Sequence, residues 1–237
     1  MPPPSPQSPA PSPLFVLYGG TFDPVHDGHL AVARAARDAL GTTVRMMPAA
    51  DPPHRAPPGA TADQRAEMLE IALAGEPGLC VDRRELRRAG RSYSIDTLLD
   101  LRAQVGPEAP VALLVGADSF VDLPDWHRWR ELFEHAHFVV AQRPGSPLDA
   151  GLRPELAAEL AGRWCAAPAA LFEVPAGRVL RLEQPPHAES ATAIRRQVAA
   201  GGDWRDDVPA AVAHYIERHG LYLNRAGHHR LRDAPRL

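Results

Sequence analysis

Residues 14–29, LFVLYGGTFDPVHDGH, form the stretch from which the fold can be predicted. The apolar run 14–18 predicts a buried strand, and helix-compatible periodicity begins near Gly28. The turn between them therefore lies at the carboxyl end of a strand. Gly19 and Gly20 allow a phosphate to approach the backbone there, and the amides at the helix N-terminus favour its negative charge. The stretch predicts a nucleotide-phosphate site.

His26 and His29 stand three residues apart at the start of this helix, so both imidazoles can converge at its mouth. Two imidazoles that donate hydrogen bonds to phosphate oxygens would stabilise the charge that builds up during phosphoryl or nucleotidyl transfer, and no covalent nucleophile is needed. The motif alone leaves two alternatives open. The histidines could simply cap the helix, or they could bind zinc, although no obvious cluster of further ligands is close in sequence.

Beyond this stretch, short apolar runs alternate with segments of helical periodicity. The predicted strands are residues 14–18, 44–47, 111–115, 138–141 and 178–182. The predicted helices are residues 29–40, 62–74, 94–105, 154–163, 191–200 and 208–218, with Asp63 capping the second and Gly220 stopping the last. The pattern predicts an α/β fold: a Rossmann-like, doubly wound parallel sheet with helices on both faces and a C-terminal helical segment.

Composition restricts the class of ligand. The chain has 237 residues, 45% of them hydrophobic, and a formal net charge of -3, which argues against a surface that coats nucleic acid. All 26 basic residues are arginine. Without lysine, a Schiff base and a Walker A phosphate loop are excluded. Phosphate contacts must therefore come from arginine, histidine, hydroxyls, backbone amides or metal.

The remaining features predict a soluble, cytoplasmic, single-domain protein. We expect one domain over residues 14–223, a disordered Pro-rich lead-in over 1–13 that is no signal peptide, and a disordered tail over 224–237. No apolar run approaches the roughly 18 residues needed to span a bilayer. Cys80 and Cys165 follow no metal or disulfide pattern, and we expect them to be reduced and buried.

The double glycine, Phe22-Asp23-Pro24 and the HxGH pattern at 26–29 together resemble the HxGH nucleotidyltransferase superfamily. Ordered blocks across 14–223 are more closely similar to the bacterial nicotinate-nucleotide adenylyltransferases. These blocks are Pro48–Arg55, Arg91–Leu98, Gly116–Ser119, Leu123–Trp126 and Ser190–Arg195. Three positions depart from the family pattern: Arg55 replaces lysine, Ser94 replaces threonine and Glu189 replaces an apolar residue.

The resemblance implies a site for nicotinate mononucleotide. Trp126 would stack on the electron-poor nicotinate ring, whose positive charge is attracted by the indole face. Backbone amides near Ser94 and His127 would receive the nicotinate carboxylate without placing a full cation beside the pyridinium. The residues implied for this acceptor are His54, Arg55, Ser92, Tyr93, Ser94, Trp126 and His127.

The resemblance to the nicotinate-nucleotide adenylyltransferases also implies a site for ATP. Arg195 would meet the β- or γ-phosphate, and Ser190 is a good N-cap whose helix amides offer an anion site. Asp118 could accept from ribose hydroxyls, help to position metal, or cap the short helix that follows. The implied ATP-binding residues are Gly19, Gly20, Thr21, Phe22, His29, Gly116, Asp118, Ser119, Ser190, Thr192, Ile194 and Arg195.

The implied reaction is attack of the nicotinate mononucleotide 5′-phosphate on the ATP α-phosphorus. His26, His29 and Arg195 are the implied catalytic residues, Mg²⁺ would accompany ATP, and no residue is assigned as a metal ligand. Asp23 would buttress the turn, because an anionic phosphate nucleophile needs no general base.

Several alternatives remain. The acceptor could be nicotinamide mononucleotide, pantetheine phosphate or, with CTP, an alcohol phosphate. The chain could also be a non-catalytic nucleotide sensor, or bind RNA as the tRNA synthetases with related motifs do. The partners that we expect are ATP and nicotinate mononucleotide, without nucleic acid or membrane, and a homo-oligomer stays open.

Overall fold

The computed structural model describes residues 13–50, 59–88, 90, 92–142, 148, 151–183, 187 and 189–224. Within them, seven parallel strands form one sheet in the order β3-β2-β1-β4-β5-β7-β6. The strands are β1 (Phe15–Gly20), β2 (Val44–Pro48), β3 (Leu79–Val81), β4 (Val111–Gly116), β5 (His137–Ala141), β6 (Trp164–Cys165) and β7 (Val179–Leu182). The chain reverses its direction of winding between β1 and β4, which lie side by side at the centre. This confirms the predicted doubly wound parallel sheet.

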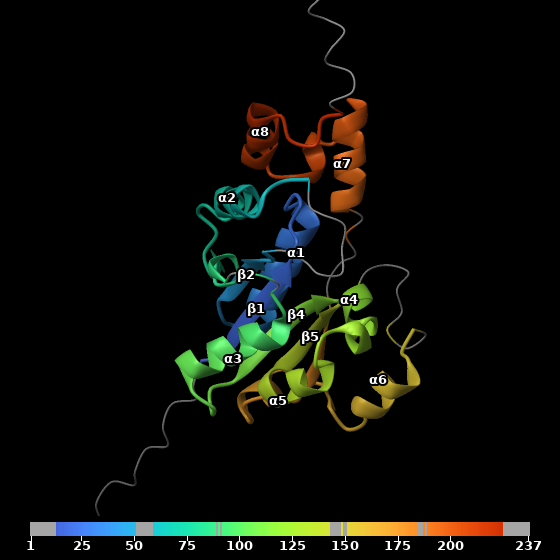
Figure 1. Ribbon diagram of the computed structural model, residues 1–237. Helices are drawn as coiled ribbons and strands as arrows, with labels where there is room; N and C mark the ends of the chain where they lie inside the picture. Colours follow the sequence, from blue (N-terminus) through green and yellow to red (C-terminus); the bar gives the residue numbers. More distant parts are fainter. Residues whose placement is uncertain are drawn as a thin grey trace, which may run out of the picture.

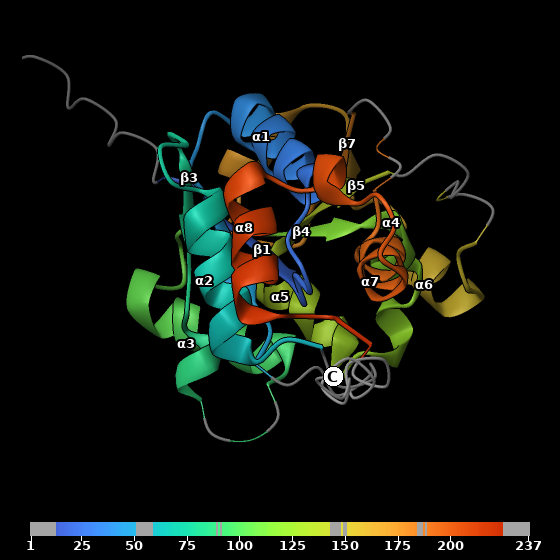
Figure 2. The same ribbon diagram turned by 90° about the horizontal axis from the view of Figure 1, so that it is seen from above.

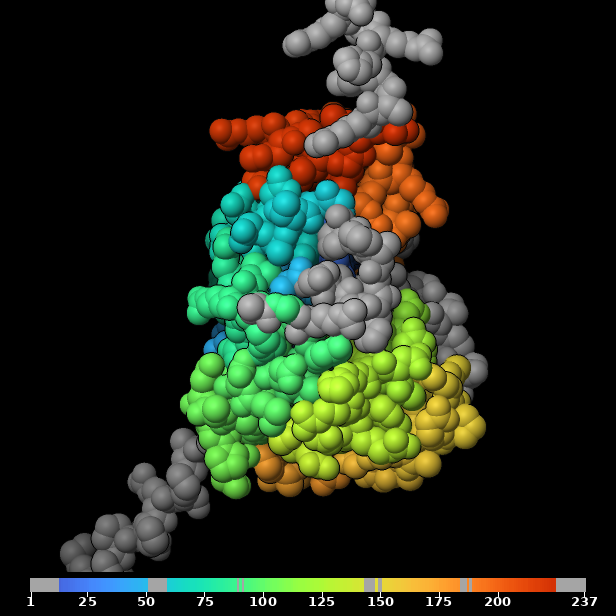
Figure 3. All heavy atoms as spheres, viewed as in Figure 1, coloured from blue at the N-terminus to red at the C-terminus, as the bar shows by residue number. Residues whose placement is uncertain are grey.

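Helices cover both faces of the sheet (Figures 1 and 2). The α-helices are α1 (Asp27–Leu40), α2 (Ala62–Ala72), α3 (Ser94–Val105), α4 (Ala117–Val121), α5 (Leu132–His135), α6 (Pro154–Glu159), α7 (Ala191–Ala200) and α8 (Ala210–His219). The 3₁₀-helices are η1 (Glu85–Arg87), η2 (Leu123–Asp125), η3 (Trp129–Glu131), η4 (Pro168–Phe172) and η5 (Arg205–Asp207). α2 and α8 lie against each other, as Figure 3 shows at the upper end of the molecule.

The two faces of the sheet belong to two hydrophobic clusters. Val16 and Tyr18 of β1 join one cluster, which also contains apolar residues of α1, α2, α7 and α8. Leu17, which alternates with them, joins the other cluster, where α3, α4, α5 and α6 pack. Because successive side chains of a strand point to opposite faces, β1 is covered on both sides, which explains its near-continuous apolar sequence.

Helix boundaries correct one predicted cap and confirm another. Asp63 lies inside α2, and Thr61 is the N-cap: its hydroxyl accepts from Gln64 N at 3.2 Å, and the Gln64 side chain accepts from Thr61 N at 3.0 Å. This reciprocal capping box satisfies two backbone donors that Asp63 would leave open. Gly220 ends α8 with φ 57°, the left-handed conformation that glycine adopts at low cost.

The sequence missed two strands, and its expectations for the two cysteines and for one helix were wrong. β3 and β6 were not predicted because strands of three and two residues show too little periodicity. Cys80 is exposed and Cys165 only partly buried, since each stands on one of these edge strands. The predicted helix 154–163 is shorter, because α6 ends at Glu159.

The predicted disordered ends lie outside the described residues, apart from residues 13 and 224. In the part of the chain that the structure describes, no helix is long and apolar enough to cross a membrane.

Candidate active site at the carboxyl edge of the sheet

A cleft of ≈ 810 Å³ lies where β1, β2, β4 and β5 end, next to the point where the chain changes its direction of winding. Open α/β sheets bind their ligands at this place. The predicted residues that line the cleft are Gly19, Gly20, Thr21, Phe22, His26, His29, Ser92, Tyr93, Ser94, Gly116, Asp118, Ser119, Trp126, His127, Ser190, Thr192 and Arg195. Segments far apart in the sequence are thus brought to one site.

Among the predicted residues that the structure describes, Ile194 alone does not line the cleft. Ile194 is fully buried in the hydrophobic cluster on the α1 and α8 face of the sheet, so its side chain belongs to packing. His54 and Arg55 lie outside the described residues.

His26 and His29 lie ring against ring at the beginning of α1. Their ring centroids are 3.7 Å apart, and His26 is 2% exposed. His29 Nδ1 accepts a hydrogen bond from the His26 backbone N–H at 3.3 Å, so the neutral imidazole of His29 carries its proton on Nε2. The His29 ring also meets the Phe22 ring in a T-shaped arrangement, with centroids 4.9 Å apart. Helix capping and convergence on the cleft therefore occur together.

Asp23 ties the turn before this motif to other segments. Its carboxylate is buried and accepts from Gly59 N at 2.8 Å, Ala60 N at 3.1 Å and the Tyr222 hydroxyl at 2.8 Å. Its backbone carbonyl accepts from Arg195 Nη1 at 2.7 Å. With its oxygens engaged in this way, Asp23 has the buttressing role that the sequence predicted.

Arg65 supports the same turn, and sequence reasoning missed it. The side chain reaches from α2 and is 1% exposed. Its guanidinium donates to Thr21 O at 2.7 Å and to Ala50 O at 3.0 Å, which joins the phosphate-site turn to the end of β2. A burial of this kind is rare for arginine, and nothing in its local sequence distinguishes Arg65 from a surface helical arginine.

Arg195 reaches the turn from α7. The helix begins after Ser190, whose hydroxyl accepts from Ala193 N at 3.1 Å, as predicted for its N-cap. Arg195 donates to the Asp23 carbonyl and, at 3.4 Å, to the Thr192 hydroxyl. The beginning of α7 therefore brings the Ser190 and Thr192 hydroxyls and the Arg195 guanidinium to the cleft, next to helix amides that favour an anion.

The end of β4 adds a second wall to the cleft. Gly116 is the N-cap of α4, and Asp118 and Ser119 stand in the first turn of that helix. Asp118 is therefore not the N-cap that one interpretation of the sequence predicted. From its position inside the first turn, Asp118 still lines the cleft.

The aromatic side of the cleft is formed by α3 and the segment after η2. Tyr93 is the N-cap residue of α3, and its ring centroid lies 4.6 Å from that of His127. Trp126 is half-buried and packs against the cluster on the α3 face, whereas Trp129 is a core residue, 8% exposed, as predicted. An indole and a phenol ring thus border the cleft.

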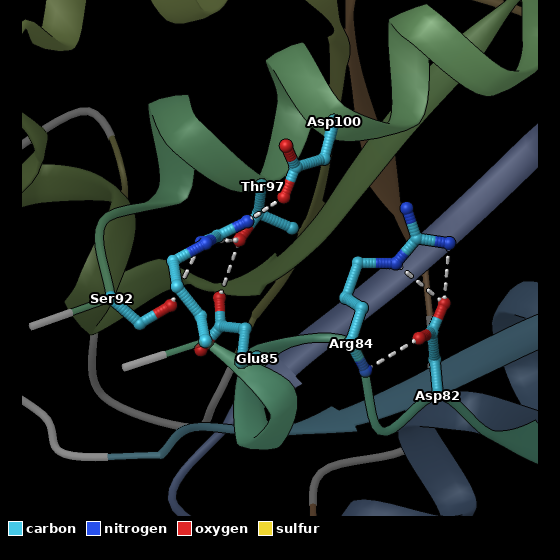
Figure 4. Close-up of polar contacts among 7 residues, drawn as sticks. Asp82, Arg84, Glu85, Ser92, Thr97 and Asp100 are labelled. Atoms are coloured by element: carbon cyan, nitrogen blue, oxygen red, sulfur yellow. Dashed lines mark hydrogen bonds and ion pairs between the residues drawn. The ribbon is translucent and has the colours of Figure 1, made fainter. Parts of the chain in front are cut away.

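A buried polar network, shown in Figure 4, holds this aromatic side together. Glu85 is 6% exposed and borders the cleft, and its carboxylate accepts from the Thr97 hydroxyl at 2.9 Å. Arg88 donates to Ser92 Oγ at 3.1 Å and Thr97 Oγ1 at 3.2 Å, and forms an ion pair with Asp100. The hydroxyls therefore stand between the buried carboxylate and the arginine.

Burial raises the pKa of Glu85, while hydrogen bonds from Thr97 and Ser92 act in the opposite direction. The sequence contained no clear signal for this role, because Glu85 stands in an arginine-rich stretch that is typical of a solvated surface.

No set of three or more His, Cys, Asp or Glu side chains that could hold a metal ion occurs among the described residues. The zinc interpretation of the histidine pair therefore gains no support from their surroundings.

Comparison with known proteins places this cleft in a family. The Cytidylyltransferase-like family model matches residues 17–197. A "Probable nicotinate-nucleotide adenylyltransferase" of Stenotrophomonas maltophilia (strain K279a) is 60% identical over 214 residues, which cover 88% of this chain and 96% of the relative. A relative of the same name from Laribacter hongkongensis (strain HLHK9) is 51% identical over 210 residues, covering 87% and 93%.

The fold is similar to that of a solved Plasmodium falciparum nicotinic acid mononucleotide adenylyltransferase complexed with NaAD. The TM-score is 0.66 at 13% identity, over 89% of this chain and 97% of that one. The chain therefore belongs to the cytidylyltransferase-like family and, within it, to the nicotinate-nucleotide adenylyltransferases.

Proposed function

We propose that this chain transfers the adenylyl group of ATP to nicotinate mononucleotide, giving nicotinate adenine dinucleotide and pyrophosphate. An oxygen of the acceptor 5′-phosphate forms a bond to the ATP α-phosphorus, and the bond from that phosphorus to the oxygen bridging to the β-phosphorus breaks. The observation that carries the proposal is the convergence of the paired imidazoles of His26 and His29 with the Arg195 guanidinium on one turn of the cleft. In-line transfer needs positioned donors of this kind.

His29 acts as a hydrogen-bond donor toward the phosphates. Its Nδ1 accepts from the His26 backbone N–H, so its own N–H is on Nε2, the atom that would donate to a phosphate oxygen. Each preorganised donor of this type contributes about 10²–10³ in turnover. Arg195, held at the turn by the Asp23 carbonyl, stabilises the pyrophosphate as it leaves. The glycines at 19 and 20, with Thr21 and Phe22, let the phosphates approach the main chain.

The aromatic side of the cleft receives nicotinate mononucleotide. Trp126 offers its indole face to the pyridinium, and the backbone amides near Ser94 and His127 receive the carboxylate. Ser92 and Tyr93 complete this side. His54 and Arg55 would contribute from the segment 51–58, which lies outside the described residues.

Mg²⁺, bound mainly through ATP phosphates and water, would neutralise the charge of the polyphosphate. We assign two possible contacts to the Asp118 carboxylate in the cleft. It would either contact the ion through water or accept hydrogen bonds from the ribose hydroxyls. An ion held in this way needs few protein ligands. Among the described residues, no group of three or more His, Cys, Asp or Glu side chains could hold a metal ion. We place the reaction in the cytoplasm, where ATP is supplied.

An acceptor assay tests the proposal. Purified protein is supplied with ATP, Mg²⁺ and nicotinate mononucleotide, nicotinamide mononucleotide or pantetheine phosphate in parallel, and pyrophosphate release is measured. We expect the highest kcat/KM with nicotinate mononucleotide. Faster turnover of either other acceptor would overturn the choice of substrate, and absence of pyrophosphate release with all three would favour a nucleotide sensor.

A further inference from the structure

Among the described residues, Tyr222 is the partner of the turn at Asp23 that is most distant in sequence. It stands 199 positions after Asp23, and its hydroxyl donates to Asp23 Oδ1 at 2.8 Å. Its backbone has φ 63°, a left-handed conformation that is uncommon for a residue with a side chain. The chain beyond α8 is thus folded back so that this tyrosine reaches the turn of the active site.

The ring of Tyr222 packs on Gly59. A Cβ atom at position 59 would lie 2.8 Å from Tyr222 Cδ1 and 2.9 Å from Cε1, closer than such atoms approach in proteins. The same point is 3.7 Å from the Arg195 Cδ atom. Tyr222, Gly59 and Arg195 therefore pack together at Asp23.

The hydrogen bonds of Asp23 show what the tyrosine hydroxyl does there. The carboxylate is satisfied by three neutral donors: the Gly59 and Ala60 amides and Tyr222. Arg195 Nη1 lies 3.7 Å from Asp23 Oδ2, too far for a hydrogen bond, and donates to the Asp23 carbonyl instead. Because neutral groups satisfy the carboxylate, the arginine is not drawn into a close ion pair with it.

Burial and the neighbouring Asp23 carboxylate raise the pKa of Tyr222 far above its ordinary value. The hydroxyl therefore keeps its proton at neutral pH and stays a donor.

We infer that Tyr222 is a positioning residue for adenylyl transfer: by satisfying the Asp23 carboxylate, it keeps the Arg195 guanidinium available to the departing pyrophosphate. The inference rests on the role proposed for Arg195. Without the tyrosine hydroxyl, Asp23 would gain a closer hydrogen bond from Arg195, and the cation would turn from the cleft toward the carboxylate.

The test removes only the hydroxyl. Tyr222→Phe is compared with Tyr215→Phe, a matched control in which a tyrosine of α8 loses its hydrogen bond to Glu67 of α2. We expect Tyr222→Phe to lower kcat about tenfold, with a smaller change in the KM for nicotinate mononucleotide, and to weaken the binding of inorganic pyrophosphate measured by calorimetry. Tyr215→Phe should retain the wild-type kcat.

A double-mutant cycle separates positioning from a general structural effect. In an Arg195→Ala background, Tyr222→Phe should have little further effect on kcat, because the residue through which it acts is absent. If Tyr222→Phe lowered kcat by the same factor in both backgrounds, the inference would be overturned. An unchanged kcat and pyrophosphate affinity in folded Tyr222→Phe protein would also overturn it.

If Tyr222→Phe fails to fold, Gly59→Ala provides a second test, because the added methyl group would clash with the Tyr222 ring and displace it. A wild-type kcat in that folded variant would also overturn the inference. A wild-type protein that releases no pyrophosphate would instead refute the proposed function.

Discussion

The His29 imidazole accepts a hydrogen bond at Nδ1 from the backbone N–H of His26, and the two rings lie with their centroids 3.7 Å apart. This hydrogen bond caps the N-terminus of α1 and fixes the tautomer of His29, which lines the cleft. The Nε2–H donor is therefore oriented in the absence of ATP, and electrostatic catalysis depends on preorganised donors of this kind.

His29→Ala should lower kcat by about 10²–10³, because it removes the donor that we propose to stabilise transition-state charge. The loss of unfolding free energy should be small, since the bond at Nδ1 is a single helix-capping contact. Steady-state kinetics and thermal unfolding of the same preparations measure both quantities. His214→Ala, at an exposed position of α8, serves as control, and equal kcat values in the two variants would remove His29 from the reaction.

Trp126→Ala should raise the KM for nicotinate mononucleotide about tenfold, while the KM for ATP changes less, because we propose that the indole stacks on the acceptor only. Trp126→Phe should recover part of the loss. Trp164→Phe, on the edge strand β6, is the matched control. If the KM for ATP rises as much as that for the acceptor, Trp126 does not distinguish the two substrates.

Glu85→Gln should change the pH dependence of stability. Burial raises the pKa of Glu85 above its ordinary value of 4.5, so its contribution to stability is fully present below pH 4.5 and is lost as the pH rises through the folded-state pKa. The glutamine variant carries no buried charge, and its unfolding free energy relative to wild type should therefore increase with pH. Urea unfolding across pH 4–8 measures this, with the exposed Glu108→Gln as control; a pH-independent difference would contradict it.

His137 should make the fold sensitive to acid. It is fully buried; Nε2–H donates to Val174 O at 2.9 Å, and Nδ1 accepts from Arg178 N at 3.0 Å. Burial lowers the pKa of His137 to about 4, so its stabilising contribution is present above pH 6.5 and is lost as the pH falls toward 4, at a cost of about 3 kcal/mol of unfolding free energy.

His137→Asn, which lacks this titration, should show a shallower loss of stability between pH 6.5 and 4, although it is less stable at neutral pH. Urea unfolding at intervals over this range measures the slope. An identical slope in the variant and the wild type would show that other groups dominate acid unfolding.

The parts of the site that could be predicted from sequence are carried by contiguous motifs. His26 and His29 follow a strand and a glycine pair, and Ser190 precedes the helix that it caps, so short-range rules were sufficient. Ile194 lies in the same short block, yet its side chain faces the core because of the rotation of α7.

Arg65, Glu85 and Tyr222 could not be identified in this way. Their roles depend on which distant segments the sheet topology brings together, and no local sequence pattern shows this. Similarly, the exposure of Cys80 follows from the position of β3 at the edge of the sheet, which periodicity does not indicate.

The bonds of Asp23 have a consequence for synthesis on the ribosome. The HxGH segment emerges early, but Arg195 follows Asp23 by 172 positions and Tyr222 by 199. At about 5–20 residues per second, the turn waits roughly 10–40 s for its last partner. A nascent chain therefore carries the motif long before Arg195, the cation that we propose to bind pyrophosphate, is in place. A message truncated before codon 222 would encode a protein that keeps the HxGH motif but lacks the Tyr222 hydrogen bond to Asp23.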